Sequence, residues 1–336
     1  MRPSHAPLDE FDTLLGGAST GHDVLSPPGR GETSDGPPTS RRSMRVGRTR
    51  SLRTTLLAVV IASAGVGVML YPSAASWFSD LRQHDQLGSY AEHIDATDPA
   101  VLAARLDAAR TYNAGLSGGA LHDPFTTAAS GVLDDEVLDY LGQIVSQPGE
   151  IMAELRIPGI AALLPVYQGT SDATLKQGIG HLYGSSLPVG GPGTHAVLTG
   201  HRGYPEATMF SNLDRMAVGD AFTITTLGET LTYEVTSTEV VLPDDTGSLA
   251  VQPGRDLVTL ITCTPTGINT HRLLVHAERV ANAPENGSAD TSAGSVGFPW
   301  WTVGAAGALA AGAVIVIVRR RGPAGLPPSA SSGSGV

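Results

Sequence analysis

The sequence predicts a mainly β fold, with a helical region before it and one membrane-spanning helix on either side. From residue 154 onward, short runs rich in β-branched residues alternate with Gly, Pro and Asp turns, which is typical of a closed or sandwiched β domain. Two long apolar runs without charged residues flank this part, and each is long enough to span a bilayer. Between the first run and the strands, Ala, Leu and Tyr recur at three- and four-residue spacings, which indicates helices.

Residues 1–53 are dominated by Gly, Pro, Ser, Thr and charged residues without a structural period, which predicts a disordered tail. Its basic end, residues 41–53, directly abuts the apolar stretch 54–79. Basic runs can bind nucleic acid, but at this position they are typical of the cytoplasmic edge of a transmembrane helix. The small residues Ser73, Ala74 and Ala75 leave a cleaved signal peptide as the alternative, although the apolar run is longer than is usual there.

Residues 80–150 are expected to form a helical region outside the membrane. Asp98 and Pro99 match an N-cap followed by a first-turn proline, and Gly115 matches a helix end. The tripeptide Asp123-Pro124-Phe125 then follows, and by its residue types alone it is a turn leading to a core aromatic.

A strand, loop and strand near the end of the β region contain Cys263, the only cysteine of the chain. Residues 257–264 read as a strand that stops at Pro265, and residues 271–280 read as its hairpin partner. A hairpin of this length brings Arg272 near Cys263. A thiol nucleophile needs a base and a donor for the oxyanion, and the hairpin supplies the thiol and the guanidinium. A buried, inert thiol is the alternative for a lone cysteine.

The best candidate for the base is His201, which stands at the exit of a strand over residues 194–200, where side chains become available to substrate. Spacing alone does not choose among the five histidines of the β region, which are His181, His195, His201, His271 and His276.

The second apolar run, residues 298–318, opens with Trp300 and Trp301 and closes on Arg319, Arg320 and Arg321. Interfacial tryptophans and cytoplasmic arginines orient this helix with its C-terminus inside. Both termini are therefore expected in the cytoplasm and the β region outside, with residues 283–297 as a linker and 319–336 as a cytoplasmic tail.

The part between the two spans is strongly acidic, with 10 lysines and arginines against 26 aspartates and glutamates in residues 80–299. Such a charge makes nucleic acid an unsuitable partner. No ligand-spaced cluster indicates a metal, and no motif indicates an organic cofactor.

Three separated strings together resemble the sortases, the cysteine transpeptidases of Gram-positive surfaces. They are TGHR around His201, TLITC ending at Cys263, and HRLLV beginning at His271. The longer surrounding strings are most similar to class C, the pilin-polymerising sortases, over about residues 123–280. One departure is Thr266, where class C members usually have an aromatic after Cys-Thr-Pro.

This resemblance implies an eight-stranded β-barrel over residues 151–282. It also implies that Cys263 is the nucleophile, His201 the acid and base, and Arg272 the holder of the oxyanion or peptide backbone. In class C sortases an Asp-Pro-aromatic tripeptide forms a lid, so Asp123 would face Arg272 and Phe125 would cover the thiol.

The function expected from the resemblance is cleavage of an LPxTG-like sorting signal and transfer of the acyl group to a pilin lysine. Membrane lipid and pilin subunits are then the partners. The alternatives are a housekeeping-type sortase that attaches proteins to cell-wall peptide, a simple thiol hydrolase, and a non-catalytic pilus-assembly or adhesion module.

Overall fold

The structure, a computed structural model, describes residues 42–116, 121, 140, 142–145, 150–282 and 296–321, with side chains from residue 52 onward. The predicted lid, Asp123-Pro124-Phe125, lies outside the described residues, as does most of the tail before α1.

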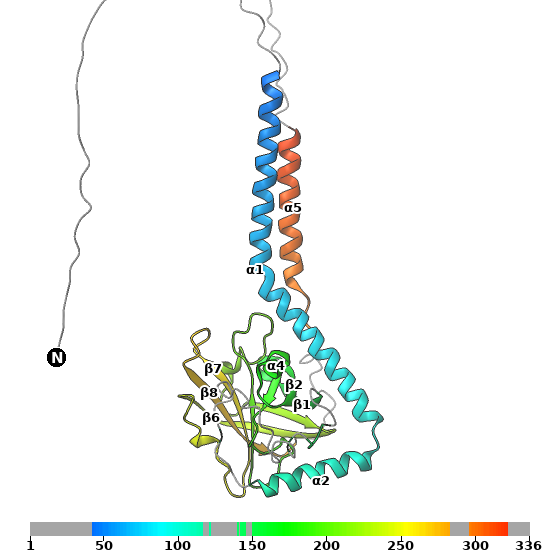
Figure 1. Cartoon of the computed structure of the whole chain (residues 1–336), viewed down its shortest axis with the longest axis vertical. Coiled ribbons are helices and arrows are strands. Elements are labelled where there is room, and N and C mark those ends of the chain that lie inside the picture. Colours follow the sequence, from blue (N-terminus) through cyan, green and yellow to red (C-terminus); the bar gives the residue numbers. More distant parts are fainter. Residues whose placement is uncertain are drawn as a thin grey trace, which may run out of the picture. The chain divides into compact units, whose positions relative to one another are not determined.

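Eight strands close into a barrel in the order β1-β2-β3-β4-β7-β8-β6-β5, which confirms the expected fold (Figure 1). The pairs β2–β3 and β4–β7 are parallel, and the remaining pairs are antiparallel. The strands are β1 Ile151–Ile157, β2 Ala162–Gln168, β3 Ile179–His181, β4 Thr194–Thr199, β5 Ala221–Thr226, β6 Glu229–Val241, β7 Asp256–Thr264 and β8 His271–Val280.

Short helical turns fill several of the connections. They are η1 Pro158–Ile160, α4 Asp172–Gln177, η2 Leu213–Arg215 and η3 Gly247–Leu249. The strand β3 was not anticipated from the sequence, because three residues are too few to show a two-residue alternation.

The barrel interior is an apolar core to which alternate residues of the strands contribute. Leu155 and Ile157 of β1, Leu198 of β4 and Leu260 of β7 are each 0% exposed. Burying one such side chain is worth about 1.5 to 3 kcal/mol. The strand ends, where the alternation stops, are therefore held by a rigid core.

The helices before the barrel are α1 Arg42–Ala96 and α2 Pro99–Gly115. The helix α1 runs without a break through both the predicted span 54–79 and the helical region after it, although it contains Pro72. Asp98 caps α2 as expected, since its carboxylate accepts a hydrogen bond from the Ala100 amide at 2.8 Å.

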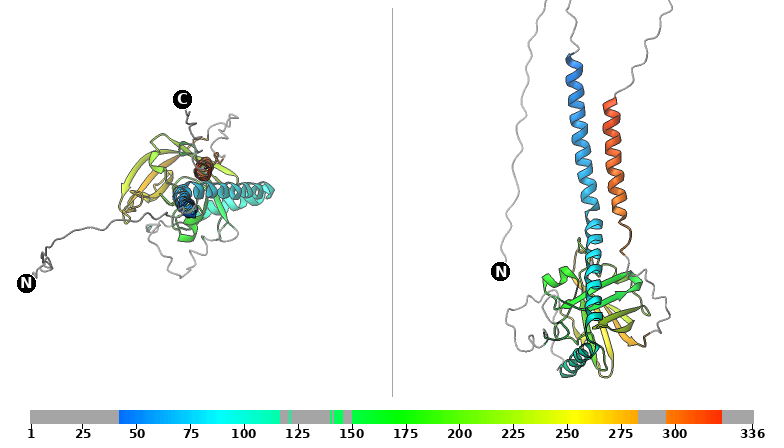
Figure 2. Two further views of the ribbon diagram at one scale, coloured as in Figure 1. Left: turned by 90° about the horizontal axis from the view of Figure 1, so that it is seen from above. Right: turned by 90° about the vertical axis from the view of Figure 1, so that its right-hand side faces the viewer.

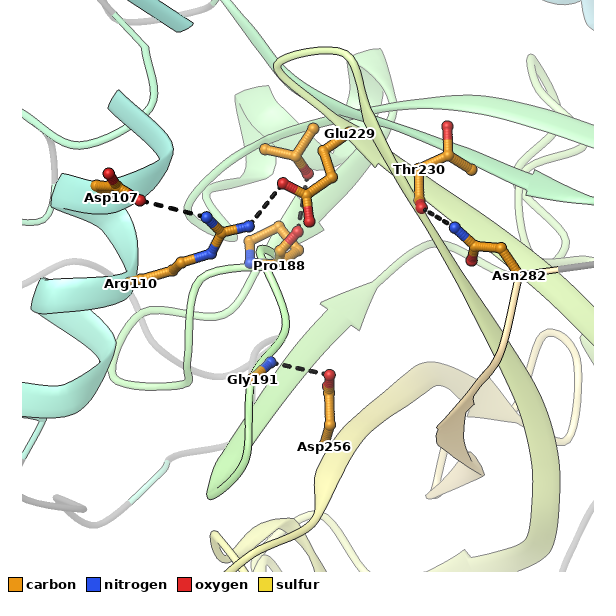
Figure 3. A network of polar contacts seen from close by, with 9 residues as sticks. Asp107, Arg110, Pro188, Gly191, Glu229, Thr230, Asp256 and Asn282 are labelled. Atoms are coloured by element: carbon orange, nitrogen blue, oxygen red, sulfur yellow. Dashed lines mark hydrogen bonds and ion pairs between the residues drawn. The ribbon is translucent and has the colours of Figure 1, made fainter. Parts of the chain in front are cut away.

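Two side chains tie α2 to the barrel. Arg110 forms an ion pair with Glu229 at 2.6 Å and a longer one with Asp107 at 3.3 Å (Figure 3). These groups are about 40% exposed or more, so the pairs contribute little. The buried Asn113 contributes more, because its amide donates to the carbonyl of Leu187 at 3.0 Å and accepts from the Leu187 amide at 2.7 Å.

Asp256, at the start of β7, is a second polar anchor. Its carboxylate accepts a hydrogen bond from the Gly191 amide at 2.8 Å (Figure 3). It also accepts one from the Tyr233 hydroxyl at 3.0 Å. Burial raises the pKa of Asp256, and these two hydrogen bonds oppose the rise. The loop before β4 is thereby held against the beginning of β7.

The last helix, α5 Trp300–Arg321, lies beside α1 (Figures 1 and 2). A Cβ at Gly312 would lie 2.9 Å from the Val59 side chain, and the Trp77 indole donates to the Gly297 carbonyl at 2.8 Å. By length and composition, α5 and residues 52–96 of α1 suffice to cross a membrane, with mean hydropathies of 2.1 and 2.0.

Candidate active site

His201 and Cys263 come together because β4 and β7 are parallel neighbours. The last paired residues of this ladder are Thr199 and Ile261. His201 follows the end of β4 by two residues, and Cys263 lies two residues further along β7. The chains stay side by side past the ladder, since the Gly200 amide donates to the Ile261 carbonyl at 3.1 Å. Parallel register therefore places the imidazole and the thiol at the same end of the barrel.

Gly200 is required at this close approach. A Cβ there would lie 2.6 Å from the Ile179 side chain and 2.8 Å from that of Phe210. The Thr262 hydroxyl also donates to the Gly200 carbonyl at 2.7 Å. Any larger residue would push the His201 segment away from β7.

Cys263 and Arg272 lie directly opposite each other in the antiparallel pair β7–β8. The predicted hairpin had placed Arg272 near Cys263, and the register of β7 and β8 agrees with this. Both side chains are buried, at 8% and 6% exposure. The Arg272 guanidinium donates to the carbonyls of Asn269 and His271, each at 3.1 Å, which fixes it at the mouth of the β7–β8 loop. A cation held in this way beside a thiol suits stabilisation of a developing oxyanion.

The surroundings of His201 keep its ring neutral and oriented. Its imidazole stacks on Tyr204 with ring centroids 5.4 Å apart and an interplanar angle of 19°. Burial is the largest influence and lowers the pKa of His201, Asp172 opposes that shift, and Lys176 adds to it. A neutral imidazole at neutral pH is the form that accepts a proton from an incoming nucleophile.

Arg202 was not singled out from the sequence, although it follows His201 directly. Its Nη1 donates to the Thr264 hydroxyl at 3.0 Å, and its Nη2 pairs with Asp214 at 2.6 Å. The side chain is 12% exposed. Arg202 directly follows His201 and Thr264 directly follows Cys263. Their hydrogen bond therefore joins the two segments beyond the last paired residues of β4 and β7. In a sequence, such an arginine looks the same as one on an ordinary surface.

Two of the other histidines have structural surroundings. His181 is fully buried, with Nε2 at 2.8 Å from the Ser186 carbonyl and Nδ1 at 2.9 Å from the Tyr140 hydroxyl. Burial lowers its pKa to about 4. His271 begins β8 and lies 2.9 Å from the Thr270 hydroxyl. The remaining two, His195 and His276, lie further along the outer face of the barrel.

A second, buried apolar cluster adjoins the candidate site on the outer face of β4, β7 and β8. It consists of Leu182, Val197, Leu249, Ile261 and Leu274, and Leu121 packs against it. Because Ile261 and Cys263 are two residues apart on one strand, they share this face. A small cavity beside it is lined by Val241, Pro243, Thr246, Leu249, Ile261 and Arg272. In the described ranges, no group of three or more His, Cys, Asp or Glu side chains could hold a metal ion.

Comparison with known proteins finds similarity to sortases. The sortase domain family matches residues 155–280. The crystal structure of sortase C-1 from Actinomyces oris is 49% identical with a TM-score of 0.51, covering 54% of this chain and 99% of that one. Sortase A from Corynebacterium diphtheriae is 46% identical with a TM-score of 0.55, covering 61% and 96%.

Among curated sequences, sortase D of Bacillus subtilis is 31% identical over 137 residues, which is 40% of this chain and 66% of the relative. The chain spans about half to two thirds of the length of the curated relatives that it matches.

Proposed function

Because this chain belongs to the sortase family, we propose that it is a membrane-anchored cysteine transpeptidase of the pilin-polymerising class. The observation that carries the proposal is the meeting of Cys263, His201 and Arg272 at one end of the barrel, through the β4–β7 and β7–β8 registers. The 49% identity to a sortase C-1 supports the class.

The first half of the proposed reaction forms an acyl-enzyme. The Cys263 sulfur attacks the threonyl carbonyl of an LPxTG-like sorting signal while the neutral His201 takes the thiol proton, and Arg272 stabilises the oxyanion of the tetrahedral intermediate. The bond between Thr and Gly breaks, and His201 gives a proton to the departing amine. A thioester between Cys263 and the threonyl group remains.

In the second half, a pilin lysine amine attacks the thioester, and His201 takes its proton. The carbon–sulfur bond breaks, an isopeptide bond forms, and the thiol is restored. The lowered pKa of His201 serves this step, because a neutral imidazole is ready to accept that proton.

We assign the lid role to Asp123-Pro124-Phe125 within the same proposal. Supporting it, Leu121 packs on the cluster that contains Ile261, so the chain reaches the face of Cys263 two residues before Asp123.

A direct competition distinguishes the two candidate acceptors, which are a pilin lysine and a cell-wall peptide amine. A housekeeping-type sortase is the second candidate, because a protein named sortase A also matches closely. The full chain in detergent is incubated with a sorting-signal peptide, a pilin with its acceptor lysine, and a cell-wall peptide amine, and products are located by mass spectrometry. We expect an isopeptide bond to the pilin lysine. Exclusive transfer to the cell-wall amine would favour the second candidate, and release of free acid alone would indicate a hydrolase.

A peptidyl vinyl sulfone tests catalysis itself. A sortase labels at Cys263, whereas a non-catalytic assembly or adhesion module does not.

A further inference from the structure

A row of polar side chains crosses four neighbouring strands of the barrel. It consists of His195 on β4, Thr259 on β7, His276 on β8 and Glu239 on β6, and we call it the polar row. The His195 Nδ1 lies 3.1 Å from the carbonyl of Ala250, in the segment between β6 and β7. His195 Nε2 lies 2.7 Å from the Thr259 hydroxyl, which lies 2.8 Å from His276 Nδ1, and His276 Nε2 lies 3.0 Å from the Glu239 carboxylate.

The polar row shares a strand face with the candidate site. Thr259 precedes Cys263 by four residues on β7, so both point to the outer face, about 13 Å apart at ~3.3 Å per residue. His195, Glu239 and His276 of the row line a pocket of about 380 Å³. The segment of residues 242–255 is held there by Ala250 on the row and by Leu249, which packs with Ile261 in the apolar cluster.

The hydrogen atoms of this row can be counted. Four hydrogen bonds link its four side chains and the Ala250 carbonyl, and each needs one hydrogen. A carbonyl and a carboxylate only accept, a neutral imidazole donates one hydrogen, and a hydroxyl donates one. Two neutral histidines and one threonine therefore supply three hydrogens for four bonds.

From this count we infer that the polar row is a proton-binding site that holds one extra proton in the folded protein. Without it, two acceptors would face each other at hydrogen-bond distance, which is unfavourable for partly buried groups. The inference concerns folding and the β6–β7 segment, and does not depend on the proposed reaction.

The extra proton belongs on His276. The other imidazole of the row is that of His195, and burial is the main reason why its pKa is lowered. The Ala250 carbonyl opposes this shift, whereas His276 and Arg255 add to it. The nearby Ser248 hydroxyl and then His276 lower the pKa of Glu239, so the carboxylate is ionised. An imidazolium between Thr259 and this carboxylate completes all four bonds.

The charged groups around His276 come from every strand beside it. Glu239 faces it from β6, and His195 lies on β4, one strand beyond β7, and reaches it through Thr259. Glu278 follows on the same face of β8 and pairs with Arg255 at 2.6 Å. Because Arg255 and Glu278 are paired with each other, the carboxylate left to balance an imidazolium is Glu239.

Without the proton, three hydrogens are shared among four contacts, so the bond from His195 to the Ala250 carbonyl, which holds residues 242–255, is made only part of the time. The stabilising contribution of the row is present while the proton is bound and is lost as pH rises through the titration of the row. As pH rises toward that titration, the opening equilibrium of the segment should rise by up to about tenfold per pH unit, the limit for one linked proton, and it should level off above the titration.

Two substitutions remove the need for the proton in different ways. In Glu239→Gln, the amide donates to a neutral His276, so all four bonds form without it. In Thr259→Val, the row divides into two bonds that two neutral histidines satisfy. Glu278→Gln is the matched control, because it neutralises a carboxylate on the same strand face but outside the row.

The experiment is nuclear magnetic resonance of the full chain in detergent micelles with ring-labelled histidine. At pH 7 we expect one imidazolium signal that disappears in His276→Gln and is thereby assigned to His276. The same signal should be absent in Glu239→Gln and Thr259→Val, and it should be present in Glu278→Gln. Neutral forms of both row histidines in the folded wild type at pH 7 would overturn the inference.

Hydrogen exchange of residues 242–255, corrected for intrinsic rates, gives a second readout. We expect a pH-dependent opening in the wild type and Glu278→Gln, and a flat profile in Glu239→Gln. The same pH slope in Glu239→Gln as in the wild type would also overturn it. Neither measurement uses a substrate, so its failure is separate from failure of the proposed reaction.

Discussion

We expect the thiol of Cys263 to contribute to chemistry more than to packing, and its replacement tests this directly. Cys263→Ala should abolish cleavage and transfer. The free energy of unfolding should change by only about 1 kcal/mol, because the substitution removes little more than one small apolar group. Peptide cleavage and thermal unfolding are the measurements. Retained transpeptidation in this variant would end the sortase assignment of the site.

The two partners of the thiol should matter to different degrees. His201→Ala should lower the rate about 10²- to 10⁴-fold, the range for a general acid or base. Arg272→Ala should cost about 10²- to 10³-fold, typical of one oxyanion donor. His195→Ala serves as the comparison, because His195 bonds to Ala250 and Thr259 away from the thiol. If His195→Ala were the inactive variant, the choice of base would be wrong.

The pH dependence of acyl transfer should respond to the charges beside His201. Lys176 lowers the pKa of His201 and Asp172 raises it. Lys176→Gln should therefore move the acid limb of the profile to higher pH, and Asp172→Asn should move it to lower pH. Both side chains are exposed, so the shifts should shrink as salt screens them. Shifts in the same direction, or shifts unaffected by salt, would contradict this account.

Arg202 is expected to position the two catalytic strand ends without touching the substrate. Arg202→Met should lower kcat up to about 10²-fold, since small displacements of reacting groups are costly, and leave KM nearly unchanged. Thr264→Val removes the acceptor and should act in the same direction, with the double variant no worse than the more severe single one. Arg215→Met is the matched control on the same loop, because Arg215 is exposed. Equal effects of the two arginine substitutions would mean that Arg202 only stabilises the fold.

At the scale of elements, we propose that the tripeptide Asp123-Pro124-Phe125 regulates access to the end of the barrel where Cys263 lies. A closed lid divides the apparent affinity by the fraction of open molecules. A buried aromatic is worth about 1.5 to 3 kcal/mol and an exposed ion pair about 0 to 1, so Phe125→Ala should open the lid more than Asp123→Ala. Stopped-flow titration of Cys263 should show the fastest labelling in the double variant, because Pro124 makes the two anchors act together. Equal labelling rates in the wild type, the two single variants and the double variant would remove the lid from the mechanism.

At the scale of the whole molecule, α1 and α5 should both cross the membrane with the barrel outside. Arginines at residues 41–53 and 319–321 predict that both termini are cytoplasmic. Protease treatment of protoplasts should remove the barrel and spare tags at either end. Loss of the N-terminal tag would indicate a cleaved or inverted first segment.

The sequence by itself determined the parts of this protein whose signals are local. Strand alternation, turn residues, the Asp98-Pro99 cap and the uncharged runs each act within a few residues, and a short hairpin was enough to place Arg272 near Cys263. Motif resemblance selected His201, which spacing could not do.

Only the tertiary structure decided the contacts between distant segments. The parallel pairing of β4 with β7 joins residues about sixty positions apart, and no local pattern specifies which strands become neighbours. The short strand β3, the Arg202 link to Thr264 and the polar row all depend on that closure of the barrel. The physical reason is that periodicity reports which face of an element is buried, whereas register between elements is fixed by packing and hydrogen bonds across the whole chain.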